Sequence, residues 1–366
     1  MPNPLLKPVE LAIRRAFLRG LGLLGKARRH TAALAPEHLV ARLGPEPSIL
    51  LLRQDRLGDL LMSSFFLVAL RTRFPGAHIA IVLGKNNAAG FPLLPANCEA
   101  FVYSKRFLQD MRMLRTIRKR NFDLMIDLTD KASVTSSIFL ALSGAKIRLG
   151  VAKENSVVYD LTVPQFAARS RHITERVAEM LRPLGIDPET VDRSPRLNVR
   201  ANHTPGRVGM NVSSRTADRS APPAAMAEIA RGILSEGVTE VLVFSAPNDR
   251  ERGRKTVRLA NDPHIREAPY VKEFTDLAEQ IASCEYLVSV DTSVTQIASA
   301  AKVPMVLLFN AEIDQFPWTP IGVPFEIHRQ RPNLESLEPQ PVLALFKKLM
   351  VQSATSIVAQ PKIANS

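Results

Sequence analysis

The residues Asp291-Thr292-Ser293 form a short polar run between two apolar stretches of the type that makes buried parallel strands. These stretches are residues 286–290 and 305–309, and an alanine-rich segment between them has the length of a short helix. Asp, Thr and Ser are favourable N-cap residues, so the helix is expected to begin at this run. A helix that follows a parallel strand presents unpaired backbone N–H groups, so the pattern predicts an anion site that would suit a diphosphate. The alternative is an ordinary strand-helix-strand unit whose cap satisfies only its own helix.

A second polar run follows the apolar residues 49–52, which are typical of a central parallel strand. It reads Arg53-Gln54-Asp55-Arg56-Leu57-Gly58-Asp59. Gly58 would permit a tight turn, and the apolar spacing of residues 60–70 predicts a helix after it. The run therefore places two carboxylates and two guanidinium groups at the end of a predicted strand.

Strand and helix patterns alternate through the chain, which predicts an α/β protein with helices on both faces of parallel sheets. A segment dense in Pro, Asp and Arg, residues 187–205, marks a domain boundary, and the alternation then resumes. A last helix near residues 341–350 is expected to pack back across this boundary. The predicted organisation is an amphipathic segment at 1–45, a domain at 46–190, a linker at 191–206, a second domain at 207–335, a C-terminal helix at 336–350 and a disordered tail at 351–366.

The composition is that of a soluble globular protein with room for two domains: 366 residues, 46% hydrophobic and 23% charged. A net charge of +13 favours polyanionic partners, which include nucleic acid, anionic lipid headgroups and phosphorylated substrates. Nucleic acid is disfavoured because the aromatic residues are scattered singly and no ribonucleoprotein or zinc-finger pattern occurs. A nicotinamide dehydrogenase is disfavoured because no Gly-x-Gly-x-x-Gly follows a predicted strand. Cys98 and Cys284 lie far apart, which supports neither a disulfide nor a cysteine metal site and favours the reducing cytoplasm.

The N-terminal segment from Lys7 to Arg29 predicts a basic amphipathic helix with an apolar side that includes Ile13 and Phe17. The segment contains no apolar run long enough to span a bilayer, and its arginines interrupt the region where the apolar core of a signal peptide would lie. The helix is expected to lie on a surface. Its partner is either an anionic membrane face or the protein's own domain.

Four motifs in order carry a family resemblance. They are Asp55-Arg56-Leu57-Gly58-Asp59, then Asn211-Val212-Ser213-Ser214 with Arg219 and Pro222 downstream, then Asp291-Thr292-Ser293-Val294-Thr295-Gln296-Ile297-Ala298, and finally Trp318-Thr319-Pro320-Ile321-Gly322. With these motifs the chain resembles glycosyltransferase family 9, the ADP-heptose:lipopolysaccharide heptosyltransferases, over residues 49–322.

The resemblance implies a GT-B fold, in which two Rossmann-like domains face each other across a cleft. The N-terminal domain would bind a lipid-linked lipopolysaccharide core acceptor and the C-terminal domain a nucleotide-sugar, which the resemblance implies is ADP-heptose. The reaction would be an inverting, metal-independent displacement without a cofactor, catalysed by a cytoplasmic protein that can associate with the inner membrane. A catalytically inactive nucleotide-sugar-binding module is the main alternative that is not an enzyme.

Asp59 matches the family's proposed base, which takes the proton from the acceptor hydroxyl. Its alternative role is a helix-capping carboxylate, and Asp55 is the rival base, or a partner of Arg53 or Arg56. The acceptor-binding residues are expected to be Arg53, Asp55, Arg56 and Gly58. The donor-binding residues are expected to be Ser213, Ser214, Arg215, Arg219, Asp291, Thr292, Ser293 and Gln296.

Three donor-side positions carry alternatives. Arg219 falls where the family has a phosphate-binding Lys, but Arg215 and Arg219 could also be solvated loop charges in a basic protein. Ser293 replaces a family Gly and adds a Cβ where the backbone would approach phosphate. Gln296 replaces a family His and offers an uncharged amide. These changes allow a different nucleotide-sugar or a weakly active, nucleotide-sugar-binding paralogue.

Overall fold

The structure is a computed structural model that describes residues 16–17, 20, 36–95, 97–166, 171–200, 202–214, 219–311 and 318–358. The chain divides into two compact units, Met1–Arg193 and Ser194–Ser366. The division falls inside the segment predicted as a linker, residues 191–206. Each unit is described by itself below.

The first unit contains a six-stranded parallel sheet in the order β3-β2-β1-β4-β5-β6. Its strands are β1 (Ser48–Arg53), β2 (His78–Gly84), β3 (Glu99–Tyr103), β4 (Leu124–Asp127), β5 (Ile147–Val151) and β6 (Leu161–Val163). The helices are α2 (Pro36–Leu43), α3 (Leu57–Met62), α4 (Ser64–Arg73), α5 (Phe107–Arg120), α6 (Val134–Leu142) and α7 (Ile173–Ala178), with 3-10 turns η1 (Ala88–Leu93), η2 (Ser156–Val158) and η3 (Glu179–Leu184).

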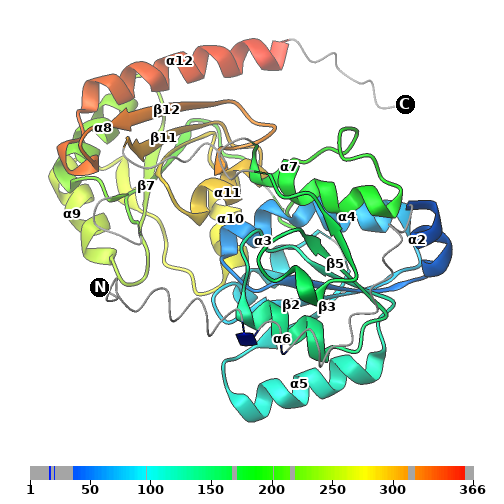
Figure 1. Ribbon diagram of the computed structural model, residues 1–366. Helices are drawn as coiled ribbons and strands as arrows, with labels where there is room; N and C mark the ends of the chain where they lie inside the picture. The colour runs from blue at the N-terminus through cyan, green and yellow to red at the C-terminus, as the bar shows by residue number, and fades with distance from the viewer. Residues whose placement is uncertain are drawn as a thin grey trace. The chain divides into compact units, whose positions relative to one another are not determined.

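The core of this unit follows from apolar runs that are buried on both faces of the sheet, as in parallel sheets generally. Leu50 and Leu52 of β1 point to one face, where they pack in a cluster with Ile117 of α5 and Phe139 of α6. Figure 1 shows α3 and α4 on the opposite face of the sheet. The helix predicted at residues 60–70 is broken into α3 and α4 at Ser63, whose hydroxyl and backbone N–H both bind the Asp59 carbonyl.

The second unit contains a six-stranded parallel sheet in the order β12-β11-β10-β7-β8-β9. Its strands are β7 (Arg207–Asn211), β8 (Glu240–Phe244), β9 (Ile265–Glu267), β10 (Tyr286–Val290), β11 (Met305–Asn310) and β12 (Phe325–Gln330). The helices are α8 (Pro223–Leu234), α9 (Arg250–Ala260), α10 (Phe274–Ala282), α11 (Ser293–Ala300) and α12 (Pro339–Val358), with the 3-10 turn η6 (Leu334–Ser336). Apolar residues of α8 and α12 cover one face of this sheet.

The two sheets have the same strand order when each is counted along the chain, and both are doubly wound. The order reverses between β1 and β4 in the first sheet and between β7 and β10 in the second. In open parallel sheets the crevice at the carboxyl ends of such a strand pair is the usual ligand site. The prediction of two Rossmann-like α/β halves is therefore confirmed, and each half has one expected binding edge.

The C-terminal helix α12 ends at Val358 rather than at Met350, so the predicted tail is wrong for residues 351–358. Two features extend it: no proline occurs between Pro341 and Pro361, and the Gln352 side chain donates to Glu326 Oε1 at 2.9 Å. The helix packs against α8, β11 and β12 of its own unit. Residues 359–366 and most of the segment Lys7–Arg29 lie outside the described residues. None of the described helices is long and apolar enough to cross a bilayer.

Candidate functional site

Arg53 ends β1 at the switch point of the first sheet, and its side chain is almost fully buried. The guanidinium group donates from Nε to the Asp59 carbonyl at 3.0 Å and from Nη1 to the Leu128 carbonyl. It therefore links β1 to α3 and to the segment that follows β4. Its Nη2 atom has no hydrogen-bond partner among the described residues and lies 3.8 Å from Asp59 Oδ1. Arg53 thus supplies a buried positive charge at this edge.

Asp59 lies in the first turn of α3, where its Oδ2 atom accepts a hydrogen bond from the backbone N–H of Arg56 at 3.1 Å. The capping role that the sequence left open is therefore present. This contact holds the carboxylate in place and uses one oxygen, so Oδ1 stays close to Arg53. The proposed role of Asp59 as a base stays a prediction.

Asp55 follows β1 and has a side chain that is 33% exposed, with Oδ2 at 3.5 Å from Arg53 Nη1. Its Oδ1 atom has no hydrogen-bond partner among the described residues. Burial raises the pKa of Asp55 to about 6, and the nearby charge of Asp59 adds to this rise, while the Arg53 guanidinium opposes it. Asp55 therefore has the proton affinity of a base that works near neutral pH.

The tight turn expected at Gly58 is wrong. Gly58 is the second residue of α3 and is not among the glycines with a positive φ. The chain bends at Asp55, and Arg56 is extended at φ −109° and exposed. Asp59 lies in the first turn of α3, where its carboxylate caps the helix. The run thus enters a helix directly and requires no left-handed residue.

A buried polar network lies at the end of β4, beside β1, and the sequence analysis did not identify it. Asp127 is fully buried and accepts hydrogen bonds from the Thr129 hydroxyl at 2.6 Å and the Tyr159 hydroxyl at 2.7 Å. Lys153 Nζ forms an ion pair with its Oδ2 at 3.1 Å. Burial and the Asp127 charge raise the pKa of Tyr159, so the phenol stays protonated and acts as a donor. The only signal in the sequence was an acidic residue inside an apolar strand run.

Asn211 ends β7 at the switch point of the second sheet and is buried. Its amide donates to the Ser289 hydroxyl of β10 at 3.1 Å and to the Thr292 hydroxyl at 3.0 Å. Thr292 in turn caps α11, because its hydroxyl accepts from the Val294 N–H at 3.3 Å. The predicted start of the helix at Asp291-Thr292-Ser293 is therefore confirmed. Asn211 fixes the start of α11 against the neighbouring strand, a role that sequence reasoning missed.

Most of the other residues that were predicted to bind the nucleotide-sugar follow β7 or lie at the start of α11, near the same switch point. Ser213 and Ser214 follow β7 and carry buried hydroxyl oxygens without a hydrogen-bond partner among the described residues. Arg219 Nη1 donates to Asp291 Oδ2 at 2.9 Å, so these two predicted residues form an ion pair. Ser293 is the first residue of α11. Arg215 lies outside the described residues.

Gln296 lies on α11 and is buried. Its Nε2 atom donates to the Trp318 carbonyl at 3.0 Å, while Oε1 has no hydrogen-bond partner among the described residues. Ser299 on the same helix accepts from the Ile321 N–H at 3.1 Å. The segment from Trp318 to Ile321 is thus held on α11 by two side chains. Because Nε2 already donates to Trp318, the atom of Gln296 that remains for a ligand is Oε1, which accepts hydrogen bonds.

Unpartnered polar atoms are concentrated at these two edges. Across the described ranges, ten buried side-chain nitrogen or oxygen atoms lack a hydrogen-bond partner. Six of them belong to Arg53, Gln54, Asp55, Ser213, Ser214 and Gln296. Leaving such an atom unpaired costs on the order of 1–3 kcal/mol, so their clustering indicates sites that bind a polar ligand. The described residues contain no group of three or more His, Cys, Asp and Glu side chains that could hold a metal ion.

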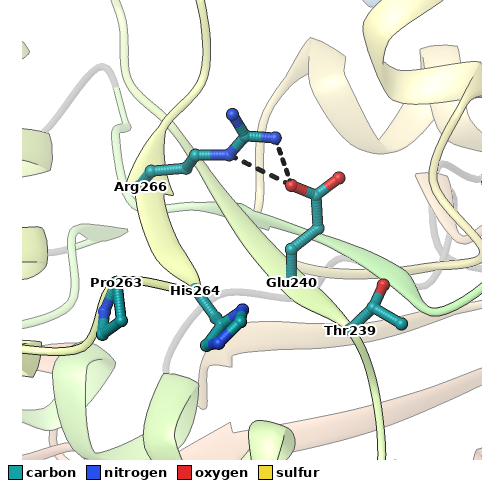
Figure 2. A pocket seen from close by; sticks show the side chains of 5 residues that line it. All are labelled: Thr239, Glu240, Pro263, His264 and Arg266. Carbon is teal, nitrogen blue, oxygen red and sulfur yellow. Dashed lines mark hydrogen bonds and ion pairs between the residues drawn. The ribbon is translucent and has the colours of Figure 1, made fainter.

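A shallow pocket at the opposite edge of the second sheet is a weaker candidate. Figure 2 shows its lining residues, which lie at the amino ends of β8 and β9. Arg266 Nε donates to Glu240 Oε2 at 3.0 Å, and Arg207 Nε donates to Glu240 Oε1 at 2.6 Å. Burial of Glu240 would raise its pKa, but the hydrogen bonds from the two arginines outweigh this and lower it. The carboxylate of Glu240 is thus paired with two arginines of its own unit, which makes this pocket the weaker candidate.

Comparison with known proteins gives one consistent result. The model of the family "Glycosyltransferase family 9 (heptosyltransferase)" matches residues 111–340, which is more than half of the chain. Lipopolysaccharide heptosyltransferase 3 of Escherichia coli K12 is 22% identical over 341 residues, covering 82% of this chain and 97% of the relative.

Solved structures agree in fold. A family 9 glycosyltransferase from Veillonella parvula matches with a TM-score of 0.74 at 18% identity, covering 84% of this chain and 98% of that one. E. coli ADP-heptose lps heptosyltransferase II matches with a TM-score of 0.68 at 19% identity, covering 84% and 99%. E. coli heptosyltransferase WaaC with ADP matches with a TM-score of 0.69 at 15% identity, covering 82% and 99%. These matches confirm the GT-B fold class.

Proposed function

Because the chain belongs to glycosyltransferase family 9, the heptosyltransferases, we propose that it moves a heptose or a related sugar from a nucleoside diphosphate-sugar to the lipopolysaccharide core. We further propose that the transfer inverts the anomeric carbon and requires neither a metal nor a cofactor. The observation that carries the proposal is the placement of the unpartnered polar groups at the switch point of each sheet.

The second unit is proposed to bind the donor. The leaving diphosphate carries growing negative charge, which must meet donors that are already in position. The N-terminal end of α11 and the hydroxyls of Ser213 and Ser214 are such donors. Arg219 uses Nη1 to bind Asp291, and a guanidinium group has further N–H donors for a phosphate oxygen. ADP in the WaaC structure and ADP-heptose in the name of heptosyltransferase II support a diphosphate donor of this kind.

The first unit is proposed to bind the acceptor and supply the base. The acceptor hydroxyl oxygen attacks the anomeric carbon, the bond from that carbon to the diphosphate oxygen breaks, and the hydroxyl proton passes to Asp59 Oδ1. A nucleoside diphosphate then leaves with the bonding electrons. Arg53 would hold the carboxylate and bind the acceptor together with Arg56, with Gly58 beside them. Asp55, whose pKa is raised to about 6, is the second candidate for the base.

The identity of the donor sugar depends on two residues. Ser293 begins α11, and Gln296 presents an acceptor oxygen rather than a cation. An acceptor suits a ligand O–H or N–H and does not suit a phosphate. This favours, as the alternative, a transferase that uses another nucleotide-sugar, or a paralogue that binds nucleotide-sugar and turns it over weakly.

The direct test is turnover by the purified full chain. ADP-heptose and several other nucleotide-sugars are offered with lipopolysaccharide core acceptor, in the presence and absence of EDTA. We expect release of the nucleoside diphosphate, formation of the extended core and no effect of EDTA. Failure to release a nucleoside diphosphate from any donor, while calorimetry shows that the donor binds, would favour the non-catalytic alternative.

The place of action is proposed to be the cytoplasm at the inner face of the inner membrane, where a lipid-linked core would be met. The segment Lys7–Arg29 was predicted to dock on that face, but it lies outside the described residues apart from positions 16, 17 and 20. Its membrane role stays a prediction.

A further inference from the structure

The tip of α5 exposes two large apolar side chains. Phe107 and Leu108 are 77% and 70% exposed, more than any other large hydrophobic side chain in the described ranges. Phe107 is on the same helical stripe as the buried Leu114 and Ile117, which pack against the sheet. Nothing among the described residues covers it. The tip is thus a continuation of an apolar stripe that has no partner among the described residues of the first unit.

The exposure of Phe107 and Leu108 is set by the loop that precedes α5, whose hydrogen bonds hold the start of the helix in place. Asp110 is buried, and its Oδ1 atom accepts from both the backbone N–H and the hydroxyl of Ser104 at 2.9 Å. The Asp110 N–H binds the Arg106 carbonyl at 2.9 Å. Lys105 between them is held at φ +62°, in the left-handed region. These contacts fix Phe107 and Leu108 in an outward position.

Positive charge lies along the same edge of the sheet as the tip. The exposed cations Lys85, Lys105, Arg106 and Lys131 follow β2, β3 and β4, and the strands of a parallel sheet end at one edge. None of the four has an ion pair within the part of the chain that the structure describes. The acidic side chains of this edge are engaged: Asp110 by Ser104, Asp127 by Lys153 and Asp130 by Arg176. The surface therefore combines free cations with a protruding apolar pair.

We propose that this surface, which we call the α5 edge (Lys85, Lys105, Arg106, Phe107, Leu108 and Lys131), docks on a bilayer that contains anionic phospholipid. The cations bind lipid phosphates, and Phe107 and Leu108 enter the boundary between headgroups and acyl chains. Apolar insertion next to basic residues distinguishes a bilayer from a soluble polyanion, which would use the cations alone. The inference deepens the proposed function, on which it rests for the lipid-linked acceptor.

The test uses the full chain and sedimentation with vesicles of phosphatidylcholine, either alone or with about a third phosphatidylglycerol. We expect binding to the anionic vesicles, weakened by salt, and little binding to the neutral ones. The double variant Phe107→Ser/Leu108→Ser should bind about tenfold or more weakly, because two apolar side chains no longer enter the boundary. Lys105→Glu/Arg106→Glu should lose about fivefold per residue or more.

Matched controls lie on α9 of the second unit, which is also basic. Lys255→Glu/Arg258→Glu makes the same change in net charge, and Leu259→Ser removes a 42%-exposed side chain. Both controls should bind like the native chain. Equal binding by the Phe107/Leu108 variant and the native chain would overturn the proposal. So would a result in which only the charge variant loses affinity and free DNA competes, since that result indicates a soluble polyanion site.

Insertion can be measured independently of any other membrane-binding segment. The chain has a single tryptophan, Trp318, so Phe107→Trp adds one reporter at the tip. Its emission should shift to the blue on anionic vesicles and be quenched by lipids brominated in the upper acyl chain. An unchanged spectrum would refute insertion.

The same variants separate this proposal from the proposed function. Activity on a detergent-dispersed acceptor should be unchanged in Phe107→Ser/Leu108→Ser. If the native chain binds vesicles but transfers no sugar, the proposed function is refuted and the membrane docking of the α5 edge is supported. If it transfers sugar but does not bind vesicles, the docking proposal is refuted and the proposed function is supported.

Discussion

Replacing Asp55 with Asn should stabilise the first unit at neutral pH and lose that effect in acid. The pKa of this carboxyl is raised from 3.8 to about 6, so its charged form is disfavoured in the folded state. Its contribution to stability is fully present below the unfolded pKa of 3.8 and is lost as the pH rises through 6. The Asp55→Asn variant carries no charge at this position and escapes that loss.

The expected magnitude follows from the size of the shift. A difference of about two pKa units corresponds to an upper limit of about 3 kcal/mol at pH 8. The Asp55 side chain is 33% exposed, so solvent screening reduces the expected gain to about 1–2 kcal/mol. Arg53 keeps its bonds to the carbonyls of Asp59 and Leu128 in the variant, which limits the cost of removing its acidic neighbour.

The assay must report on the first unit, and the single tryptophan lies in the second. Hydrogen exchange of the β1 and α3 amides, with calorimetry at pH 8 and pH 4, meets this need. Asp123→Asn is the matched control with the opposite sign. Burial would raise the pKa of Asp123, but hydrogen bonds from Lys146 and Ser48 outweigh it and lower that pKa, so the control should lose stability at pH 8 and not in strong acid.

Loss of stability in Asp55→Asn at pH 8, or an equal gain at both pH values, would refute the reasoning. A loss at pH 8 would mean that Arg53 stabilises the Asp55 carboxylate by more than burial penalises it. An equal gain at both pH values would mean that the gain does not come from removing the carboxylate charge.

Four further changes test the two edges. Asp59→Asn should lower kcat by about 10²–10⁴-fold and leave nucleotide-sugar affinity nearly unchanged in calorimetry, and a normal kcat would remove Asp59 as the base. Asn211→Ala should weaken nucleoside diphosphate binding by about tenfold, because Thr292 loses its amide donor, and should destabilise the second unit by about 1–3 kcal/mol in urea unfolding. Gln296→Ala should speed hydrogen exchange at residues 318–321, and protection equal to the native chain would show that the tether is not needed. Tyr159→Phe should lower the free energy of unfolding by about 1–3 kcal/mol, measured by circular dichroism, since buried Asp127 loses a hydrogen-bond donor. An unchanged unfolding transition would show that the ion pair with Lys153 is enough to stabilise Asp127.

Some of the candidate site could be predicted because its signals are local. Residues 49–52 form a continuous apolar run and residues 286–290 are apolar except for Ser289, as is typical of strands buried on both faces. Each run is followed by polar residues at its carboxyl end. The start of α11 at Ser293 follows from the hydroxyl of Thr292, a neighbour in the chain. Strands β9 and β12 have no such signal, because they are short or only partly buried and carry mixed polar and apolar residues.

Other features could not be predicted because their partners are far apart in the chain. Asp127 meets Lys153 and Tyr159, which follow it by 26 and 32 residues, and Asn211 reaches Ser289 across 78 residues. The exposure of Phe107 at the start of α5 depends on which residues pack near it in three dimensions, so its neighbours in the chain do not reveal it. Gly58 was assigned a turn that the Asp59 carboxylate makes unnecessary by capping α3.

The sequence by itself determined the two α/β halves, the alternation of strand and helix within them, and the polar runs at the ends of β1 and β10. Hydrophobic periodicity and helix capping act over a few residues, so they can be recognised without coordinates. Only the tertiary structure decided which polar atoms remain unpaired, which carboxylate gains a raised pKa, and which side chains stay exposed at the tip of α5. Those properties depend on burial and on charges brought together from distant strands, and no local pattern of residues encodes them.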